Sequence, residues 1–573
     1  LVNDQTIAEA VNTAAQINDC LTTGNMSAYI WWKTIGNANG LLNASGVPQR
    51  RGFAMGQFSR FVRPGDLRID VSASSGPLSF SAFKDPVSGR FAIVVVNNTT
   101  LPETQKFNLG GFTASTVTPW VTSATQSLES QAPLTIDNGA FTFELPSQSV
   151  VTFVGTEPPL IMSAPAASTT FGEPFRYAIT ATHSPTDYRA QGLPPGLQID
   201  PASGVISGTP TAAGEYRALV VATNPGGSHS LELTITVVRA NASVTLGGLA
   251  AFYDGSPRNA TAATAPAGLP VIFTYNGGSA PPTYPGLYTV VATVDDPNYV
   301  GGTTGTIEIG VTALVRHATS LSGAIDGSVQ ILTAENTTLN GDSRIVGDLL
   351  VPGRPEVRLN GQSAFEGMLE GAGSMDPATH TLTLNGNAAI RHVVRRIDPL
   401  TLPAVAAPPQ PPGTRSVTID EPGGSAGDFA TVRNLTLNSD VGLVAVPPGT
   451  YGSLSANGRS GFILGEAGAG PSIYNLQNLT LNGGSRIEVR GPVILVLNRG
   501  LSVNSGVTFS NHPADWLALQ FAAGGLSING NVVLPATVMA PNGTVTLNGN
   551  STLRGVVKAD RLIVNSKATL ENP

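Results

Sequence analysis

The chain has 573 residues, and at about 150 residues per domain this length predicts several domains rather than one. Only 12% of the residues are charged, while glycine (65) and proline (43) are abundant, a composition typical of turn-rich β structure. The net charge of −7, without a run of lysine or arginine, excludes a phosphate-binding surface for nucleic acid. No apolar stretch of about 18 residues is present to span a membrane. We therefore expect a mostly β, multidomain protein with no nucleic-acid partner and no membrane span.

Cysteine and histidine usage gives the next constraints. Cys20 is the only cysteine, so no intramolecular disulfide can form, and we interpret it as a small buried apolar residue. The histidines are scattered without ligand-like spacing, so the sequence favours neither a metal site nor a cofactor. Leu1 leads directly into domain-like sequence, and we expect any signal peptide to lie upstream of it. These features are typical of a secreted bacterial protein, extracellular or attached to the cell surface.

The first segment is the only part of the chain with a helical pattern. Residues 6–21 repeat apolar side chains with a period near 3.6 residues, which predicts an amphipathic helix. Residues 28–32 form a continuous apolar run, which predicts a strand buried on both faces. Residues 49–62 are again helical in pattern. A helix, a buried strand, a loop and a helix are the last elements of an α/β barrel.

At these residues the resemblance to a known family becomes specific. The motifs stand in order along the chain: Tyr29-Ile-Trp-Trp32, Gly40-Leu-Leu42, the run from Arg51 to Gly65, Val71-Ser-Ala-Ser74, the run from Phe91 to Asn98, Trp120-Val-Thr-Ser123 and the run from Leu145 to Phe153. They resemble glycoside hydrolase family 30, and in particular its xylanase-like members. The resemblance implies that residues 1–66 form the last strand and helices of a truncated (β/α)8 TIM barrel. It also implies that residues 67–156 form the β-sandwich fused to that barrel.

The family implies a retaining mechanism, in which two carboxyl groups about 5 Å apart act as acid and nucleophile. In the family these groups sit on barrel strands four and seven, which we expect upstream of Leu1. Glu9 and Glu103 match no such motif, and we interpret both as solvated charges. The sequence therefore predicts no catalytic residue in this chain and no hydrolase activity of the chain alone.

The end of strand eight is the part of the active site that the resemblance leaves in the chain. A tryptophan there is expected to stack on the sugar, so Trp31 and Trp32 are candidate substrate-binding residues. Alternation along a strand lets only one of them face the site, and both can also be structural. Lys33, Asn37 and Asn39 follow in the loop, where they would bind sugar hydroxyls or simply be exposed polar residues. Glucuronoxylan-specific members carry an arginine after the tryptophan pair, and this loop holds none.

Two further modules are expected after residue 156. Residues 157–238 carry Gly192-Leu-Pro-Pro-Gly-Leu-Gln-Ile-Asp200 and resemble the Ig-like repeats of bacterial surface proteins. Residues 239–313 carry Pro285-Gly-Leu-Tyr288 and resemble a second bacterial Ig-like type. We interpret both modules as spacers, and Asp295-Asp296 as a turn rather than a calcium site.

Residues 314–573 repeat a short strand that ends in Asn-Gly, with a period of about 20 residues. The copies are Leu339-Asn-Gly341, Leu359-Asn-Gly361, Leu384-Asn-Gly386, Leu481-Asn-Gly483, Ile528-Asn-Gly530 and Leu547-Asn-Gly549. We predict a right-handed parallel β-helix in which each repeat buries its apolar face on the next, interrupted by the proline-rich residues 399–412. The asparagine is expected to take the left-handed bend at each corner and to share hydrogen bonds along the stack.

Arg391, Arg395 and Arg396 form the one basic cluster that we single out in the repeat region. Polysaccharide lyases of β-helical shape use an arginine or lysine, so the cluster would bind an acidic sugar or would simply be solvated. The sequence as a whole favours the C-terminal portion of a secreted, modular glycoside hydrolase, a retaining endo-β-glycanase for xylan or a related polysaccharide. The alternative is a non-catalytic extracellular carbohydrate-binding or adhesion protein, and a lyase is the third candidate. In each case the expected partner is a polysaccharide or a cell-surface glycan.

The truncated barrel leads to an expectation about stability. Without its neighbours, the strand at residues 28–32 would expose two unpaired edges. The stripe of Ile7, Val11 and Ala14 would lose most of the surface that it covers, so residues 1–18 are expected to be held weakly.

Overall fold

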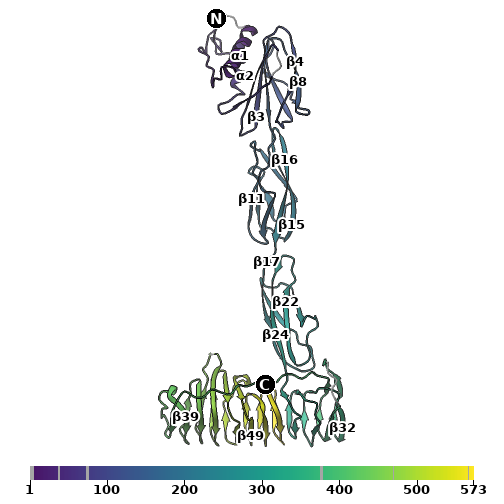
Figure 1. Ribbon diagram of the computed structural model, residues 1–573, viewed down its shortest axis with the longest axis vertical. Coiled ribbons are helices and arrows are strands. Elements are labelled where there is room, and N and C mark those ends of the chain that lie inside the picture. The colour runs from purple at the N-terminus through teal and green to yellow at the C-terminus, as the bar shows by residue number, and fades with distance from the viewer. Residues whose placement is uncertain (1–5, 37–38, 73–75, 374–378, 469, 566) are drawn as a thin grey trace. The chain divides into compact units, whose positions relative to one another are not determined.

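The computed structural model describes residues 6–36, 39–72, 76–373, 379–468, 470–565 and 567–573. The chain is mostly β and multidomain, with two α-helices near its start and strands through the rest (Figure 1). It divides into two compact units, Leu1–Ala242 with Asp295–Gly301 and Ser243–Val294 with Gly302–Pro573.

Both predicted helices are present in the first unit. Helix α1 is Ile7–Leu21, and the Thr6 hydroxyl caps it by accepting a hydrogen bond from the backbone amide of Glu9 (3.4 Å). Helix α2 is Arg50–Ser59, shorter at its end than the predicted range of 49–62.

Most of the apolar stripe of α1 is buried and Ile7 is half-buried, so the expectation that this stripe would lose most of the surface it covers was wrong. Val11 and Ala14 have no exposed surface, and Ile17 is 2% exposed. The stripe packs against α2 and the outer face of the neighbouring sheet, through Ala54, Phe58, Val94, Val96 and Val150. We had expected only the barrel to cover this stripe. The neighbouring sheet also presents an apolar outer face, and α1 packs against it.

Residues 28–32 do not form the predicted strand. Ile30 is 88% exposed and Trp32 is 64% exposed, and the segment pairs with no strand among the described residues. A strand needs partners for its backbone N–H and C=O groups, and here no neighbouring strand supplies them. The apolar composition of the run therefore did not decide its conformation.

Two sheets that face each other follow the helices. The strands are β1 (Leu67–Ile69), β2 (Leu78–Lys84), β3 (Arg90–Asn97), β4 (Glu103–Asn108), β5 (Thr116–Thr122), β6 (Ser127–Ser130), β7 (Leu134–Thr135), β8 (Ala140–Leu145) and β9 (Ser149–Thr156). One sheet has the order β1-β2-β3-β9-β5-β6 with β7 paired to β5, and the other is the hairpin β4-β8. Phe107 and Phe141 stack in the core between them at 4.7 Å, next to Phe153. Residues 73 and 74 of the motif that starts at Val71 lie outside the described residues.

The segment expected to be Ig-like also forms two sheets, with the orders β10-β16-β15-β12 and β11-β14-β13. Its strands are β10 (Ala166–Thr170), β11 (Phe175–Ala178), β12 (Asp187–Gln191), β13 (Leu197–Ile199), β14 (Val205–Gly208), β15 (Gly214–Asn224) and β16 (Gly227–Val238). Strands β15 and β16 form a long hairpin, and the core between the sheets includes Ile206, Leu233 and Ile235. This packing agrees with the sandwich that the sequence predicts for the module.

The next module begins the second unit. Its strands are β18 (Ser243–Gly247), β19 (Ala250–Phe252), β20 (Thr261–Ala265), β21 (Val271–Tyr275), β22 (Gly286–Val294) and β24 (Gly302–Gly310). Between β22 and β24, strand β23 (Tyr299–Val300) pairs instead with β17 (Ala240–Asn241), which is why residues 295–301 belong to the first unit. Asp296 accepts hydrogen bonds from the amides of Asn298 and Tyr299, which is the turn that the sequence predicts at this position.

From residue 313 onward, which we call the repeat region, every strand pairing is parallel. One closed set of strands comprises β25 (Ala313–Val315), β26 (Ser320–Leu321), β28 (Val329–Ile331), β29 (Thr337–Leu339), β31 (Leu349–Leu350), β32 (Glu356–Gly361), β34 (Met368–Glu370), β35 (Thr381–Gly386), β37 (Val393–Arg395), β38 (Arg415–Ile419), β39 (Val432–Leu437), β41 (Gly449–Ala456), β43 (Ser472–Leu481), β45 (Val493–Leu497), β46 (Leu501–Val503), β48 (Leu517–Phe521), β49 (Leu526–Asn529), β51 (Thr537–Asn548) and β53 (Val557–Val564). Two smaller sheets accompany it. The first has the order β33 (Ala364–Phe365), β36 (Ala389–Ile390), β30 (Arg344–Ile345), β27 (Ala324–Asp326), β54 (Thr569–Glu571), β52 (Thr552–Arg554) and β50 (Val533–Pro535). The second has the order β40 (Leu443–Ala445), β42 (Gly461–Leu464), β44 (Arg486–Val489) and β47 (Thr508–Phe509). Short 3₁₀ turns lie at Phe429–Thr431 and Ala514–Trp516.

The repeats do not stack in chain order. The last repeat pairs with the first, since β53 lies beside both β25 and β26 and β54 lies beside β27. The C-terminus therefore lies in the middle of the region, between β49 and β32 (Figure 1). Strand β38 is at one end and β32 with β34 at the other, so the proline-rich residues 399–412 connect opposite ends. Gln477 donates to the Pro409 carbonyl (2.9 Å) along the way.

Asparagine side chains form hydrogen-bonded ladders at the corners of the repeats. Asn529 donates to Asn504 (2.9 Å), 25 positions earlier, and Asn548 donates to Asn529 (2.7 Å), 19 positions earlier. The predicted sharing of hydrogen bonds is thus confirmed. The left-handed bend, however, falls mainly on the following glycine: at Gly386 φ is 72°, and an added Cβ would lie 3.2 Å from Gly341. Asparagine keeps ordinary backbone angles there and acts through its amide.

A buried ionic cluster joins the first module of the second unit to the repeat region. The Asp348 side chain is 1% exposed and accepts hydrogen bonds from Arg391 (Nε 2.6 Å and a second nitrogen 2.9 Å), from His392 (3.1 Å) and from the Tyr253 hydroxyl (3.1 Å). Burial raises the pKa of Asp348, but the hydrogen bonds from Arg391 and His392 outweigh it and hold this pKa below its ordinary value. Burial and the nearby Asp348 raise the pKa of Tyr253, which stays a neutral donor.

We expect Asp348→Asn to lower the stability of the repeat region by about 3 kcal/mol, because it leaves the Arg391 charge without its buried partner. The calorimetric transition of the full chain measures this loss. Because the Asp348 pKa is lowered in the folded state, the contribution is present above the ordinary carboxyl pKa of about 4 and disappears as the pH falls through the lowered value. The matched control is Asp440→Asn, which breaks an exposed pair with Arg459 and should leave the transition unchanged. Equal effects of the two changes would contradict the assignment.

Candidate functional site

The two candidate tryptophans lie in the irregular segment between α1 and α2, in different surroundings. Trp31 is partly buried: its indole Nε1 donates to the Asn39 carbonyl (2.8 Å), and the Arg51 guanidinium lies 4.9 Å from the ring centroid. Trp32 is 64% exposed, and the Lys33 ammonium lies 5.7 Å from its ring. Trp31 is therefore a packed, structural ring, whereas Trp32 faces solvent with the half-buried Lys33 beside it.

Arg51 holds this site to the helices, and the sequence reasoning gave it no role. It is 2% exposed, its Nε donates to the Thr13 hydroxyl (3.2 Å), and it forms an ion pair with Glu9 (3.4 Å). Glu9 is thus not the freely solvated charge that the sequence suggested. An arginine on the inner face of a predicted helix was the available signal, because a buried guanidinium requires an acidic or hydroxyl partner.

The loop from residue 34 to 49 is fixed by backbone hydrogen bonds. Gly36 donates to the Leu42 carbonyl (3.0 Å) and Leu42 to that of Thr34 (2.9 Å), while the Gln49 side chain donates to the Gly36 carbonyl (3.0 Å). Asn39 lies beside Trp31, and its side-chain oxygen is buried without a hydrogen-bond partner. Asn37, the fourth candidate, lies outside the described residues. The structure therefore places Asn39 beside Trp31 and Lys33 beside Trp32.

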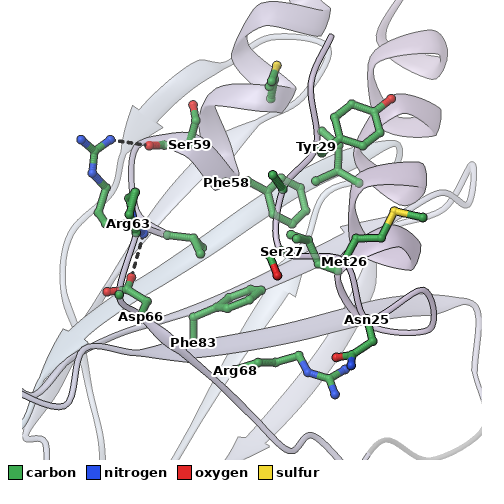
Figure 2. Close-up of a pocket in the computed structure, with 17 residues that line it drawn as sticks. Asn25, Met26, Ser27, Tyr29, Phe58, Ser59, Arg63, Asp66, Arg68 and Phe83 are labelled. Carbon is green, nitrogen blue, oxygen red and sulfur yellow. Dashed lines mark hydrogen bonds between the residues drawn. The ribbon is translucent and has the colours of Figure 1, made fainter.

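A cavity of about 540 Å³ opens near this segment but does not include the tryptophans. Figure 2 shows Tyr29, Phe58 and Phe83 around its apolar part, with Arg63 and Asp66 at one side. The Arg63 amide donates to Asp66 (2.8 Å), which also pairs with Arg90 (3.0 Å), and burial raises the pKa of Tyr29. With its carboxylate already paired, the cavity offers no acid and base pair for hydrolysis.

A second cavity, of about 660 Å³, lies between the two sheets that follow the helices. Phe80, Phe91, Phe107 and Phe112 line it, with Lys106 among its polar groups. Among the described residues, Asp70 is the one carboxylate in its lining, so the cavity offers no acid and base pair for hydrolysis.

Each arginine of the basic cluster in the repeat region has a carboxylate partner. Arg391 pairs with Asp348, and both Arg395 and Arg396 pair with Glu370. These ion pairs favour the structural interpretation over an acidic-sugar site. Within the described residues, no group of three or more His, Cys, Asp or Glu side chains is arranged to hold a metal ion. No described helix is long and apolar enough to cross a membrane.

Comparison with known families identifies the two middle modules. The Putative Ig domain family matches residues 158–238, which confirms the Ig-like module, and the MBG domain family matches residues 242–313.

Similarity to curated proteins covers about a quarter of the chain. The chain is 35% identical over 147 residues to the glucuronoxylanase XynC of Bacillus subtilis (strain 168), a match that covers 26% of this chain and 34% of that protein. The chain thus spans about a third of the length of the curated relatives that it matches. Over this part, the chain is homologous to glycoside hydrolase family 30 xylanases.

Solved structures of that family are also similar to the chain. A GH30 endoxylanase from Clostridium papyrosolvens C71 is 34% identical, with 27% of this chain and 39% of that chain covered and a TM-score of 0.24. The GH30 subfamily 8 xylanase Xyn30A from Clostridium acetobutylicum is 35% identical, with 27% and 40% covered and a TM-score of 0.26.

We expect Trp31→Ala to destabilise the helical segment by about 3 kcal/mol, because it removes a packed ring and the partner of Arg51. Trp32→Ala should change stability by no more than about 0.5 kcal/mol, since that ring is exposed. Hydrogen-exchange mass spectrometry of peptides from residues 7–59 measures both effects. Equal protection in the two variants would refute the different roles assigned to the two rings.

Proposed function

We propose that this chain is the C-terminal portion of a secreted, modular family 30 glycanase that cleaves xylan or a related polysaccharide with retention of configuration. The observation that carries the proposal is the 35% identity over 147 residues to a glucuronoxylanase. That length is close to the length of residues 1–156, in which the family's motifs stand in order. The series of β modules, two of which resemble modules of bacterial surface proteins, supports an extracellular location.

The sugar-binding role belongs to Trp32 rather than to Trp31. An exposed indole offers an apolar face to the C–H face of a pyranose, and the Lys33 ammonium beside it can donate hydrogen bonds to sugar hydroxyls. Trp31 positions the segment through Arg51 and the Asn39 carbonyl. The unpaired side-chain oxygen of Asn39 is a further acceptor at this place, and Asn37 remains a candidate donor.

The catalytic acid and nucleophile are proposed to lie outside residues 1–156. A retaining site needs two carboxyl groups about 5 Å apart around the scissile bond. Among the carboxylates of residues 1–156, Glu9 pairs with Arg51, Asp66 pairs with Arg90, and Glu103 lies on strand β4 of the sandwich. Residues 1–156 then contribute binding surface but no catalytic carboxylate.

The other modules are proposed to serve binding and spacing. The Ig-like and MBG modules act as spacers, and the repeat region is proposed to be a right-handed parallel β-helix. Support for the β-helix comes from its uniformly parallel pairings and from asparagine ladders whose partners are 19 or 25 positions apart. A non-catalytic carbohydrate-binding or adhesion protein is the second candidate, favoured by the pairing of Glu9 with Arg51 and of Asp66 with Arg90.

We expect residues 1–573 alone to release no reducing ends from xylan, because the described part of residues 1–156 offers no carboxylate pair at the tryptophan segment. A reducing-end assay on soluble and insoluble xylan measures this, with a family 30 xylanase as the positive control. Hydrolysis that a substitution within residues 1–156 abolishes would overturn the proposal that the catalytic pair lies elsewhere.

We expect the chain to bind soluble xylo-oligosaccharides weakly through Trp32. Trp32→Ala should lower the affinity by about tenfold or more, the equivalent of a lost stacking contact of about 1.4 kcal/mol. Calorimetric titration with xylohexaose measures the effect, and Ile30→Ala, which removes another exposed apolar side chain of the same segment, is the matched control. Unchanged affinity in Trp32→Ala would remove Trp32 from the proposed site.

A further inference from the structure

One side of the repeat region carries a single hydroxyl at the same outward position of nearly every repeat. The members of this hydroxyl row, in spatial order, are Thr418, Thr436, Ser455, Thr480, Ser502, Ser527, Thr546, Ser320, Thr338 and Thr383. Ile563 takes the place between Thr546 and Ser320, and Arg358 occupies the last place. The row crosses the junction between the last and first repeats, so segments far apart in sequence make one surface.

The hydroxyls of the row are accessible and mostly unused. None of them is buried, whereas their neighbours along each strand, such as Leu435 and Leu437 beside Thr436, point into the core. Asn478 donates to the Thr480 hydroxyl (3.0 Å). Within the described residues, the other hydroxyls of the row make no hydrogen bond to protein. The row therefore offers a series of free donors and acceptors to a ligand.

The spacing of the row is rigid. Parallel strands repeat at about 4.8 Å, so successive hydroxyls recur at this distance. Two residues further along each strand, the asparagine ladder ties neighbouring repeats together, for example Asn529 to Asn504 and Asn548 to Asn529. The amides of the ladder are used in holding the repeats, which leaves the hydroxyls as the groups that face a partner.

The chemistry of the row selects a neutral, polar and periodic ligand. Between Thr418 and Thr383 no member is charged, so the row does not select an anion. An extended, β-linked glycan presents hydroxyls at a repeat close to the strand spacing, so that one sugar can meet one protein hydroxyl along the row. A neutral hydrogen bond contributes only about 1 kcal/mol net in water, so binding needs many contacts at once, as an ordered polysaccharide surface supplies.

We propose that the hydroxyl row binds the surface of an insoluble, neutral, β-linked polysaccharide. The choice of a glycan rests on the proposed function. An ice surface is the other periodic array of hydroxyl groups. Serine and threonine are mixed along the row without a regular pattern, so the row gives no regular lattice of methyl groups, which favours the glycan.

The test is a depletion assay with the full chain on insoluble xylan and on microcrystalline cellulose. A row variant carries Thr436→Val, Ser455→Ala, Thr480→Val, Ser527→Ala and Thr546→Val, which remove hydroxyls but keep shape. We expect its affinity to fall at least tenfold while its melting temperature stays the same. The matched control carries Thr508→Val, Thr552→Val and Thr569→Val on the smaller sheets, and it should bind like the parent chain.

Each other outcome overturns the inference. These outcomes are no binding by the parent chain, equal binding by the row variant, and enrichment of the parent chain in growing ice without binding to polysaccharide. If the row variant does not fold, Ser502→Arg replaces it, because Arg358 shows that an arginine fits the row. Trp32→Ala separates this inference from the proposed function: it should lose xylohexaose binding and keep insoluble binding, whereas the row variant should do the opposite.

Discussion

In-register parallel pairing of backbone strands is the constraint on which most of this molecule depends. A parallel strand satisfies its N–H and C=O groups only when a neighbour lies on each side, so a stack of repeats must either continue or be protected at its ends. Here the last repeat joins the first, because β53 pairs with β25 and β26. That junction protects the edges of the first and the last repeats along the chain, and it leaves two other edges, at β38 and β32, to be covered.

Pairing of backbone groups also explains which segments of the first unit form regular structure. The sheet that contains β3 and β9 has apolar side chains on both faces, since Val95 and Phe153 face the sandwich core while Val94 and Val96 face the helices. The α1 stripe therefore finds a partner within the chain, and its Val11 and Ala14 are as buried as any core residue. The run at residues 28–32 has no such partner for its backbone and stays irregular, although it is more apolar than several true strands. Burial of side chains and pairing of backbone groups are separate requirements, and only the first is visible in composition.

This distinction sets how much the sequence could predict. The helices, the Ig-like module and the asparagine ladders follow from local patterns, and the sequence predicts them correctly. The order in which repeats stack does not follow, because every Asn-Gly repeat is chemically similar and fits beside any other. The role of Arg51 was missed for a related reason. Its partners Thr13 and Glu9 lie about 40 positions earlier in the sequence and come close to it only when α1 packs against α2. Of the candidate site, the residue types were predictable, but the different environments of Trp31 and Trp32 required the fold.

The two open ends of the stack are covered by different means. At the β32 end, Glu356 and Arg358 are both exposed and pair with each other, and charged side chains on an edge strand oppose pairing with another chain. At the β38 end, Arg415 donates to the carbonyls of Ala426 (2.7 Å) and Asp428 (3.2 Å), which folds the loop after β38 back beside the edge. Because a charged pair lies at the β32 end and a loop at the β38 end, extension of the stack by a second copy is disfavoured. The side faces, where the hydroxyls lie, are then the regular surfaces left open to a periodic partner.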